Sequence, residues 1–203
     1  MSDLHQVVFV VDDDEEVRDS LSVLLESVDL NVEAFDSAHH FLDTFDPEAS
    51  GCLVLDIRMP GMSGIELQNR LNEKQAILPV IVITGHGDVS LAVKAMKGGA
   101  VDFLQKPFDE QELLDQVHQA LADDARRRLE LDERQIILDR LATLTPRERE
   151  VMELIVDGKA NKNVAAELGV SQRTVEIHRA RVMEKTQAGS LAHLVRMALL
   201  AGE

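Results

Sequence analysis

Acidic side chains follow two apolar runs in the first third of the chain, where carboxylates could do chemistry. The run Val7–Val11 leads directly into Asp12 and Asp13, and the run Cys52–Leu55 leads into Asp56. Carboxylates that converge repel one another and need a cation, and oxygen ligands at this density suit Mg²⁺, with Mn²⁺ as the alternative ion. A carboxylate beside such an ion can act as the nucleophile toward a phosphoryl group.

A hydroxyl and an ammonium group follow two further apolar runs. Val80–Ile83 leads into Thr84, and Val101–Leu104 is followed by Lys106. Both side chains can donate hydrogen bonds to phosphoryl oxygens. Taken singly, each of these polar residues also has an ordinary structural explanation, such as a turn former, a strand-end hydroxyl or a surface lysine. Together they indicate phosphoryl chemistry, because all of them follow strands of one expected sheet.

The spacing of apolar residues predicts the fold that brings these groups together. Five short runs rich in β-branched residues, including a weaker one at Asn31–Phe35, alternate with segments of helical spacing such as Val17, Leu21 and Leu24. This alternation predicts an α/β domain with a five-stranded parallel, doubly wound sheet. Ligands of such sheets bind outside the carboxyl ends of the strands, where the direction of connection reverses.

Composition and charge divide the chain into unlike parts. It has 203 residues with 37 acidic and 21 basic side chains, a net charge of −16, and 45% hydrophobic residues, which argues against disorder. Residues 1–121 carry 23 acidic and 7 basic side chains, whereas residues 143–203 carry 8 and 9. The single cysteine, Cys52, excludes an internal disulfide, and no apolar run approaches the length of a membrane span. We expect a cytoplasmic protein that has no membrane partner.

Residues 123–142 are expected to form a helical linker. The segment has no Gly or Pro and is dense in helix-forming residues, with Leu129, Ile136 and Ile137 as its apolar positions. A solvated helix with alternating charges is the first interpretation, and a coiled-coil seam between two chains is the alternative.

Residues 143–203 are expected to form a small all-α domain. Thr145, Pro146 and Glu148 have the types and spacing of a helix start with a capping box. Two further helices, Asn161–Leu168 and Gln172–Lys185, are separated by three residues that contain a glycine. This arrangement indicates a helix-turn-helix, although an ordinary helical hairpin has the same appearance.

The second of these helices has one face suited to the major groove of DNA. Small or polar side chains on that face would meet base edges, and basic residues around it would contact phosphates. The expected contacts come from eight residues: Arg173, Thr174, Glu176, Ile177, Arg179, Ala180, Arg181 and Lys185.

Four stretches in the first half resemble the signature blocks of the receiver domain of bacterial two-component response regulators: VVFVVDDDEEVR, LVLDIRMPGMSGIEL, VIVITGHGD and GAVDFLQKPF. The resemblance covers about residues 5–122 without a visible gap, and we expect the receiver domain to comprise residues 1–122. It implies that Asp56 accepts a phosphoryl group from a sensor histidine kinase. It also implies that Asp13 binds Mg²⁺ directly, that Asp12 assists through water, and that Asp56 and the backbone carbonyl of Arg58 complete the protein ligands.

The same resemblance assigns roles in switching. Thr84 and Lys106 would contact the phosphoryl oxygens, the peptide between Lys106 and Pro107 would be cis, and Phe103 would be the switch aromatic ring. The changing face would comprise the helix at 90–97 and the strand at 101–104, through which phosphorylated chains are expected to form a homodimer.

The stretch LTPREREVMELIVDGKANKNVAAELGVSQRTVEIHRARVMEKT resembles the LuxR-type DNA-binding domain. With the receiver, the whole chain is most similar to the FixJ branch of the NarL/FixJ response regulators. That resemblance implies a transcription regulator, not an enzyme, whose partners are a sensor kinase, promoter DNA and RNA polymerase.

Three other classes of protein share part of this pattern but differ from it at particular residues. A phosphatase that forms an aspartyl-phosphate needs a second acid two residues after its nucleophile, where this chain has Arg58. A LuxR-type sensor of small molecules would lack the acidic phosphoryl site. A receiver that does not use phosphate would be expected to have lost Asp56, Thr84 or Lys106. His39, His40, His86 and Cys52 have no expected role.

Overall fold

The structure is a computed structural model, and it describes residues 6–85 and 89–202. His86 lies outside the described residues. The chain divides into two compact units, residues 1–128 and residues 129–203, and each is described by itself. None of the helices in the described ranges combines the length and the apolar character that crossing a membrane requires.

The first unit is a five-stranded parallel sheet with strand order β2-β1-β3-β4-β5. Its strands are β1 Val7–Val11, β2 Asn31–Phe35, β3 Gly51–Asp56, β4 Val80–Thr84 and β5 Asp102–Gln105. Its helices are α1 Glu15–Glu26, α2 Ala38–Thr44, α3 Gly64–Glu73, α4 Val89–Lys97 and the first part of α5 Glu110–Ala142. The doubly wound α/β fold that the apolar runs predicted is confirmed. Only strand ends differ, since β3 includes Asp56 and β5 begins one residue after Val101.

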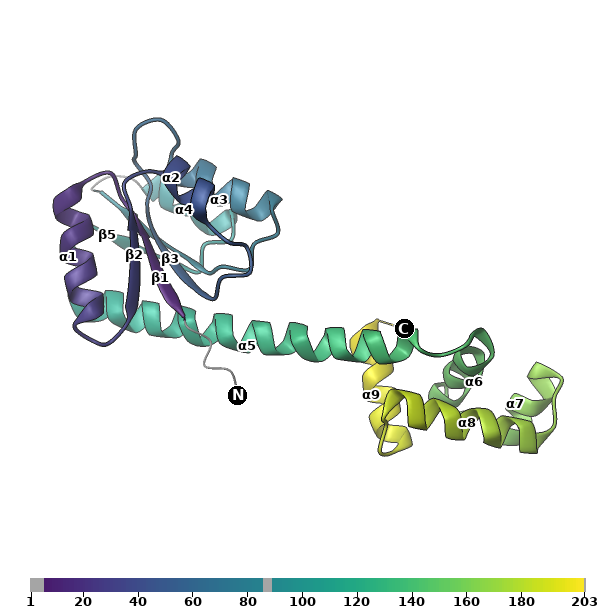
Figure 1. Cartoon of the computed structure of the whole chain (residues 1–203). Helices are drawn as coiled ribbons and strands as arrows, with labels where there is room; N and C mark the ends of the chain where they lie inside the picture. Colours follow the sequence, from purple (N-terminus) through teal and green to yellow (C-terminus); the bar gives the residue numbers. More distant parts are fainter. Residues whose placement is uncertain (1–5, 86–88, 203) are drawn as a thin grey trace. The chain divides into compact units, whose positions relative to one another are not determined.

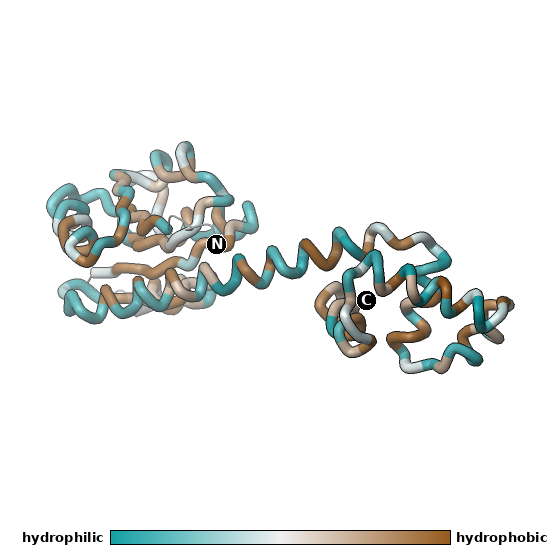
Figure 2. Tube along the Cα trace, turned by 60° about the horizontal axis from the view of Figure 1, so that its bottom comes forward, coloured by the Kyte–Doolittle hydropathy of each residue, from teal (hydrophilic) through white to brown (hydrophobic). Residues whose placement is uncertain are grey.

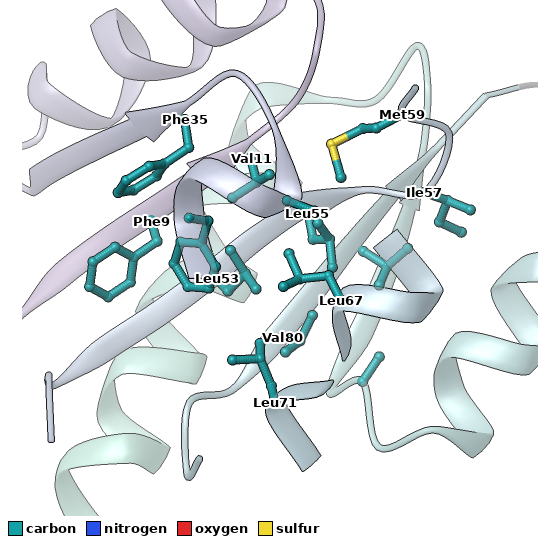
Figure 3. Close-up of a cluster of buried hydrophobic side chains, with 14 of the residues drawn as sticks. Phe9, Val11, Phe35, Leu53, Leu55, Ile57, Met59, Leu67, Leu71 and Val80 are labelled. Atoms are coloured by element: carbon teal, nitrogen blue, oxygen red, sulfur yellow. The ribbon is translucent and has the colours of Figure 1, made fainter. Parts of the chain in front are cut away.

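Each central strand is buried on both faces, which explains the continuous apolar runs. Side chains alternate across the sheet, so that Phe9 and Val11 face one core while Val8 and Val10 face the other. Helices α2, α3 and α4 cover the first core, and α1 and α5 cover the second (Figure 1). Figure 3 shows the first core, in which Phe35 lies next to Phe9 and Leu67 approaches Leu55. The tube in Figure 2 shows the corresponding brown strands between helices of mixed colour.

The lone cysteine belongs to this core. Cys52 lies on β3 and is fully buried among the side chains that face α1 and α5. Burial, together with the nearby charge of Asp124, raises the pKa of its thiol to about 12. The thiol is therefore protonated and unreactive at neutral pH.

The second unit consists of the last part of α5 and four shorter helices. These are α6 Pro146–Val156, α7 Asn161–Leu168, α8 Gln172–Thr186 and α9 Leu191–Ala201. They enclose one core that includes Val151, Val164, Val175 and Leu194, each completely buried. The capping box at the start of α6 is confirmed, because Thr145 and Glu148 exchange hydrogen bonds through both side chains.

The turn between α7 and α8 has the local chemistry that the sequence predicted. Gly169 ends α7 in the left-handed conformation with φ of 65°, which favours glycine. Ser171 then caps α8 by accepting a hydrogen bond from the backbone N–H of Thr174. The described residues therefore contain two helices joined by a short glycine turn, as in a helix-turn-helix.

Candidate functional site

Strands β1 and β3 deliver two carboxylates to the same edge of the sheet. The two strands are parallel neighbours, with Val11 paired to Leu55, so the residues that follow these two lie side by side. Asp12 and Asp56 are only 2% and 7% exposed, whereas the next carboxylate, Asp13, is exposed. Successive strands are added to the sheet in one direction from β1 to β2 and in the opposite direction from β3 onward. Ligands of such sheets bind at this point between β1 and β3.

Lys106 connects the two buried carboxylates. Its Nζ lies 2.7 Å from Asp12 Oδ2 and 3.0 Å from Asp56 Oδ1. The lysine follows β5, where its backbone N–H donates to Thr84 O at 2.8 Å, and the Lys106–Pro107 peptide bond is cis, as the receiver resemblance implies. One ammonium therefore serves two carboxylates, and the cluster keeps an excess of negative charge.

The pKa values of this cluster reflect burial and charge together. Burial raises the pKa of Asp56, and the nearby charge of Asp12 acts in the same direction, while Lys106 opposes both. For Lys106, burial alone would lower the pKa, but its hydrogen bonds and charge contacts with Asp12 and Asp56 outweigh burial and raise it. Lys106 is therefore a permanent cation at neutral pH.

The loop after β3 holds the Asp56 carboxylate from the other side. The backbone N–H of Arg58 donates to Asp56 Oδ2 at 2.6 Å, so both carboxylate oxygens have a donor. Gly64, the first residue of α3, closes the loop by donating to Ile57 O. A β-carbon at Gly64 would lie 2.2 Å from the backbone oxygen of Asp56, so only glycine allows this approach.

The remaining receiver residues lie at the same edge or on its flank. Thr84 ends β4 and is 3% exposed, with its Oγ1 3.5 Å from Gly85 O. Phe103 lies on β5 opposite Val82, and the residue is 43% exposed. The structure therefore brings Asp12, Asp56, Thr84 and Lys106 to one edge, and it leaves Phe103 at the surface.

A cavity of about 640 Å³ opens beside the carboxylates. It is lined by Asp13, Arg58, Ser63, Leu91 and Lys94, among others. Within residues 6–85 and 89–202, no three Asp, Glu, His or Cys side chains are gathered closely enough to form a metal-binding cluster. Asp12 and Asp56 point instead to Lys106.

In the second unit, α8 exposes most of the residues expected to contact DNA. Arg173, Glu176, Ile177, Ala180 and Arg181 are exposed. Thr174 is half-buried and shares a hydrogen bond with the Ser171 hydroxyl. The opposite side of the helix carries the fully buried Val175 and Val182.

Two basic residues of α8 are engaged inside the domain. Arg179 donates to the Asn161 side chain at the start of α7, at 3.2 Å. Lys185 Nζ lies 2.6 Å from Glu148 Oε2 and also donates to Thr143 O at 3.1 Å. These bonds fix the middle and the C-terminal end of α8 against its neighbours.

Glu148 is a residue whose full importance the sequence did not indicate. Its side chain is nearly completely buried, and it joins the N-terminus of α6 to the end of α8. The hydrogen bond from Lys185, followed by that from the Thr145 backbone, lowers the Glu148 pKa to about 2. The capping box was visible in the sequence, but a partner 37 residues away was not.

Comparisons with known proteins agree with both halves of this geometry. Residues 8–118 match the response regulator receiver domain, and residues 142–198 match the luxR family of bacterial regulatory proteins. The chain is 53% identical over 195 residues to the transcriptional regulatory protein FixJ of Azorhizobium caulinodans. The aligned residues cover 96% of this chain and 92% of that relative. The chain belongs to the FixJ-type response regulators.

Solved structures of response regulators resemble the whole chain. Response regulator StyR is 47% identical and matches with a TM-score of 0.87 over 96% of this chain and 98% of that one. Full-length FixJ from B. japonicum is 47% identical and matches with a TM-score of 0.61 over 97% of each chain. A response regulator of this type is a two-component transcriptional regulator, not a catalytic enzyme, and its partners are a sensor kinase and DNA. Its receiver domain is of a kind that typically binds Mg²⁺.

The Glu148–Lys185 ion pair predicts a pH-dependent stability of the output domain. The folded pKa of Glu148, about 2, is below its ordinary value of 4.5, so folding favours the charged carboxylate. This contribution is fully present above about pH 4.5 and is lost as the pH falls toward 2. Urea unfolding of the full chain, followed by circular dichroism, measures this contribution. Glu148→Gln should lower the urea concentration at the unfolding midpoint of the output domain at pH 7. At pH 3 the same substitution should lower that midpoint much less. The exposed Glu150→Gln is the control, and an equal effect of Glu148→Gln at both pH values would contradict the assignment.

Proposed function

We propose that Asp56 of this response regulator takes a phosphoryl group from a phosphohistidine of its sensor kinase. The observation that carries the proposal is the position of the Asp56 carboxylate, buried at the end of β3 with Arg58 N–H on one oxygen and Lys106 on the other. A carboxylate oxygen attacks phosphorus and the phosphorus–nitrogen bond breaks. The imidazole leaves with the electron pair and takes up a proton, and an acyl phosphate remains on Asp56.

The oxygen atoms around Asp56 suit a bound Mg²⁺, with Mn²⁺ as the alternative. We assign it to Asp13, Asp56 and the Arg58 backbone carbonyl, with Asp12 acting through water. The donors are all oxygen, the ligand type that Mg²⁺ prefers, and Asp13 and Arg58 both line the cavity beside the acceptor. When bound, the ion supplies positive charge to the phosphoryl oxygens.

The phosphoryl group would change the hydrogen bonds of Thr84 and Lys106. Phosphorylation replaces one carboxylate with a larger negative charge and three strong acceptor oxygens. Lys106 can then donate to a phosphoryl oxygen, and the Thr84 hydroxyl can turn toward another. Phe103 is our candidate for the switch ring that follows Thr84, because its exposed ring lies on the neighbouring strand. A rearranged loop and ring give the receiver two discrete surfaces.

The surface that changes is our candidate for dimerisation. Helix α4, strand β5 and the residue just before β5 expose four apolar side chains, Val93, Met96, Val101 and Phe103. Adjacent exposed apolar residues commonly mark an interaction site. A second receiver fits this face, because a two-fold pair would cover the same patch on both copies.

The output domain would read promoter DNA through α8. We assign Glu176, Ile177 and Ala180 to base edges, and Arg173 and Arg181 to phosphates at the rim. Thr174, Arg179 and Lys185 remain candidate contacts. Since the last two already donate inside the domain, we expect them mainly to hold α8 in place. The protein would act in the cytoplasm on promoters, with RNA polymerase as a further partner.

The phosphoacceptor assignment predicts a single modification. Incubation of the full chain with Mg²⁺ and acetyl phosphate should add one phosphoryl group to the intact mass, and Asp56→Asn should prevent this addition. Asp43→Asn, which changes an exposed carboxylate of α2, should leave the addition unchanged. Addition of phosphate to the Asp56→Asn protein would refute the assignment of the acceptor.

The dimerisation assignment predicts a change of mass in solution. With a stable phosphoryl mimic, the native chain should sediment as a dimer, and Val93→Glu should keep it monomeric because the charge would be buried in the interface. Val23→Glu on α1 is the matched control, since Val23 is also an exposed valine. Val23 is 68% exposed, and Val93 is 48% exposed. A native chain that remains monomeric with the mimic would exclude this part of the mechanism.

The DNA assignment predicts that two residues of α8 act differently. Arg181→Ala should weaken binding to all sequences and reduce the slope of log affinity against log salt by about 1. Glu176→Gln should instead change which base is preferred at one position of the site. Binding titrations at several salt concentrations measure the first effect, and selection from random DNA measures the second. Arg196→Ala, an exposed arginine of α9, is the control, and identical losses from Arg181→Ala and Glu176→Gln would contradict the division.

A further inference from the structure

A buried cluster of polar groups lies at the end of the sheet opposite to the phosphoacceptor. Asp124 of α5 is completely buried, and its Oδ2 accepts hydrogen bonds from the Ser50 hydroxyl at 2.6 Å and the Gly51 N–H at 3.0 Å. Arg128, one turn later, contacts the same carboxylate through Nε at 2.9 and 3.0 Å. We call this set of residues, with Glu48 and Ala49, the α5 clamp.

The arginine of the α5 clamp uses all three of its nitrogens. Besides Nε on Asp124, one terminal nitrogen donates to Glu48 O at 3.0 Å and the other donates to Ala49 O. The side chain is only 11% exposed. A planar guanidinium can satisfy a carboxylate and two carbonyls at once, whereas a lysine ammonium cannot reproduce this forked geometry.

Strand β3 connects the α5 clamp to the phosphoacceptor. The strand begins at Gly51 in the clamp, ends at Asp56, and is buried at every residue. Gly51 has a φ of 154°, and a β-carbon there would lie 1.8 Å from Val7 O, so the start of β3 is pressed against β1. Gln6, just before β1, also donates to Leu121 O of α5 at 2.8 Å. The clamp therefore joins α5 to the start of β3, and Gln6 adds a bond between α5 and the residue before β1.

The α5 clamp coincides with the boundary of the receiver unit. The compact unit ends at Arg128, although helix α5 continues to Ala142. The next residue, Leu129, is 64% exposed. Arg128 therefore holds α5 at the C-terminal boundary of the receiver unit.

We propose that the α5 clamp is a positioning device, which fixes the direction in which α5 leaves the receiver and thereby sets the spacing of DNA half-sites. The inference rests on the proposed function, in which phosphorylated receivers pair and present two output domains to DNA. A helix held by buried, forked contacts leaves each receiver in one direction. Two paired receivers then favour one separation between half-sites, since a preorganised linkage raises the effective concentration of the second domain only at a matching span.

The test compares DNA-binding profiles of phosphorylated full-length chains. Half-sites are first selected from random DNA, then placed at separations that increase by single base pairs through one helical turn. The native chain should bind one separation best and lose affinity when about five base pairs are added, because the second half-site then faces the other side of the helix. Arg128→Gln should flatten this profile and bind the best separation about tenfold more weakly. Binding to a single half-site, phosphoryl uptake and receiver dimerisation should be unchanged.

Two matched variants separate the α5 clamp from general effects of charge. Arg127→Gln removes the neighbouring arginine, which is exposed, and should preserve the native profile. Arg128→Lys keeps the charge but lacks the fork, and should flatten the profile as Arg128→Gln does. Hydrogen exchange should accelerate at residues 122–132 in both Arg128 variants while the strands keep their protection, which distinguishes a loosened helix from a misfolded receiver.

The outcomes that overturn the proposal are separate from those that overturn the proposed function. An Arg128→Gln chain with the native spacing profile, or with native exchange at residues 122–132, would refute the positioning role. A native chain that binds all separations equally would refute it as well. Failure of the native chain to take up phosphate or to dimerise would instead refute the proposed function, and with it the basis of this inference.

Discussion

The receiver depends on two ion pairs, which Lys106 forms with Asp12 and with Asp56. Two carboxylates lie almost completely buried at the ends of neighbouring strands, and a single ammonium compensates them. Burying uncompensated charge is costly, so each of the three side chains needs the other two. The cluster nevertheless keeps an excess negative charge, which is the condition for attracting a cation. The same arrangement that stabilises the edge of the sheet therefore prepares it for phosphoryl chemistry.

The two units of the chain solve different physical problems. The receiver must place charged groups at one sheet edge, and it does so with two apolar cores that leave the central strands no freedom to shift. The output domain must present one helix to a partner, and a single small core suffices for that. Ion pairs that contain a buried carboxylate then orient particular elements: Glu148 with Lys185 for α8, and Asp124 with Arg128 for α5.

Local patterns made most of the fold predictable. Continuous β-branched runs gave the strands to within a residue or two, because strands buried on both faces must be apolar throughout. Acids at the ends of such runs indicated the edge where Asp12 and Asp56 meet. Capping residues such as Thr145 and Ser171 identified helix starts, because their hydrogen bonds reach only three residues along the chain.

Long-range pairs of polar side chains were not predictable in the same way. Asp124 and Arg128 looked like charges of a solvated helix, since their partners Ser50 and Ala49 lie more than 70 residues earlier. Lys185 looked like a rim cation of α8 for the same reason, until the fold placed Glu148 beside it. A charge has no periodicity that distinguishes burial from exposure, so only the folded chain separates a structural ion pair from a free surface charge.

The state of Cys52 has a practical consequence for anyone who studies this protein by spectroscopy. Its thiol is fully buried in β3 and has a pKa of about 12, so maleimides and similar probes would find almost no thiolate to attack in the folded chain. The native sequence is then in effect a cysteine-free background. A cysteine introduced on the exposed side of α4, and another on α8, would accept fluorophores or spin labels without any prior removal of the natural thiol.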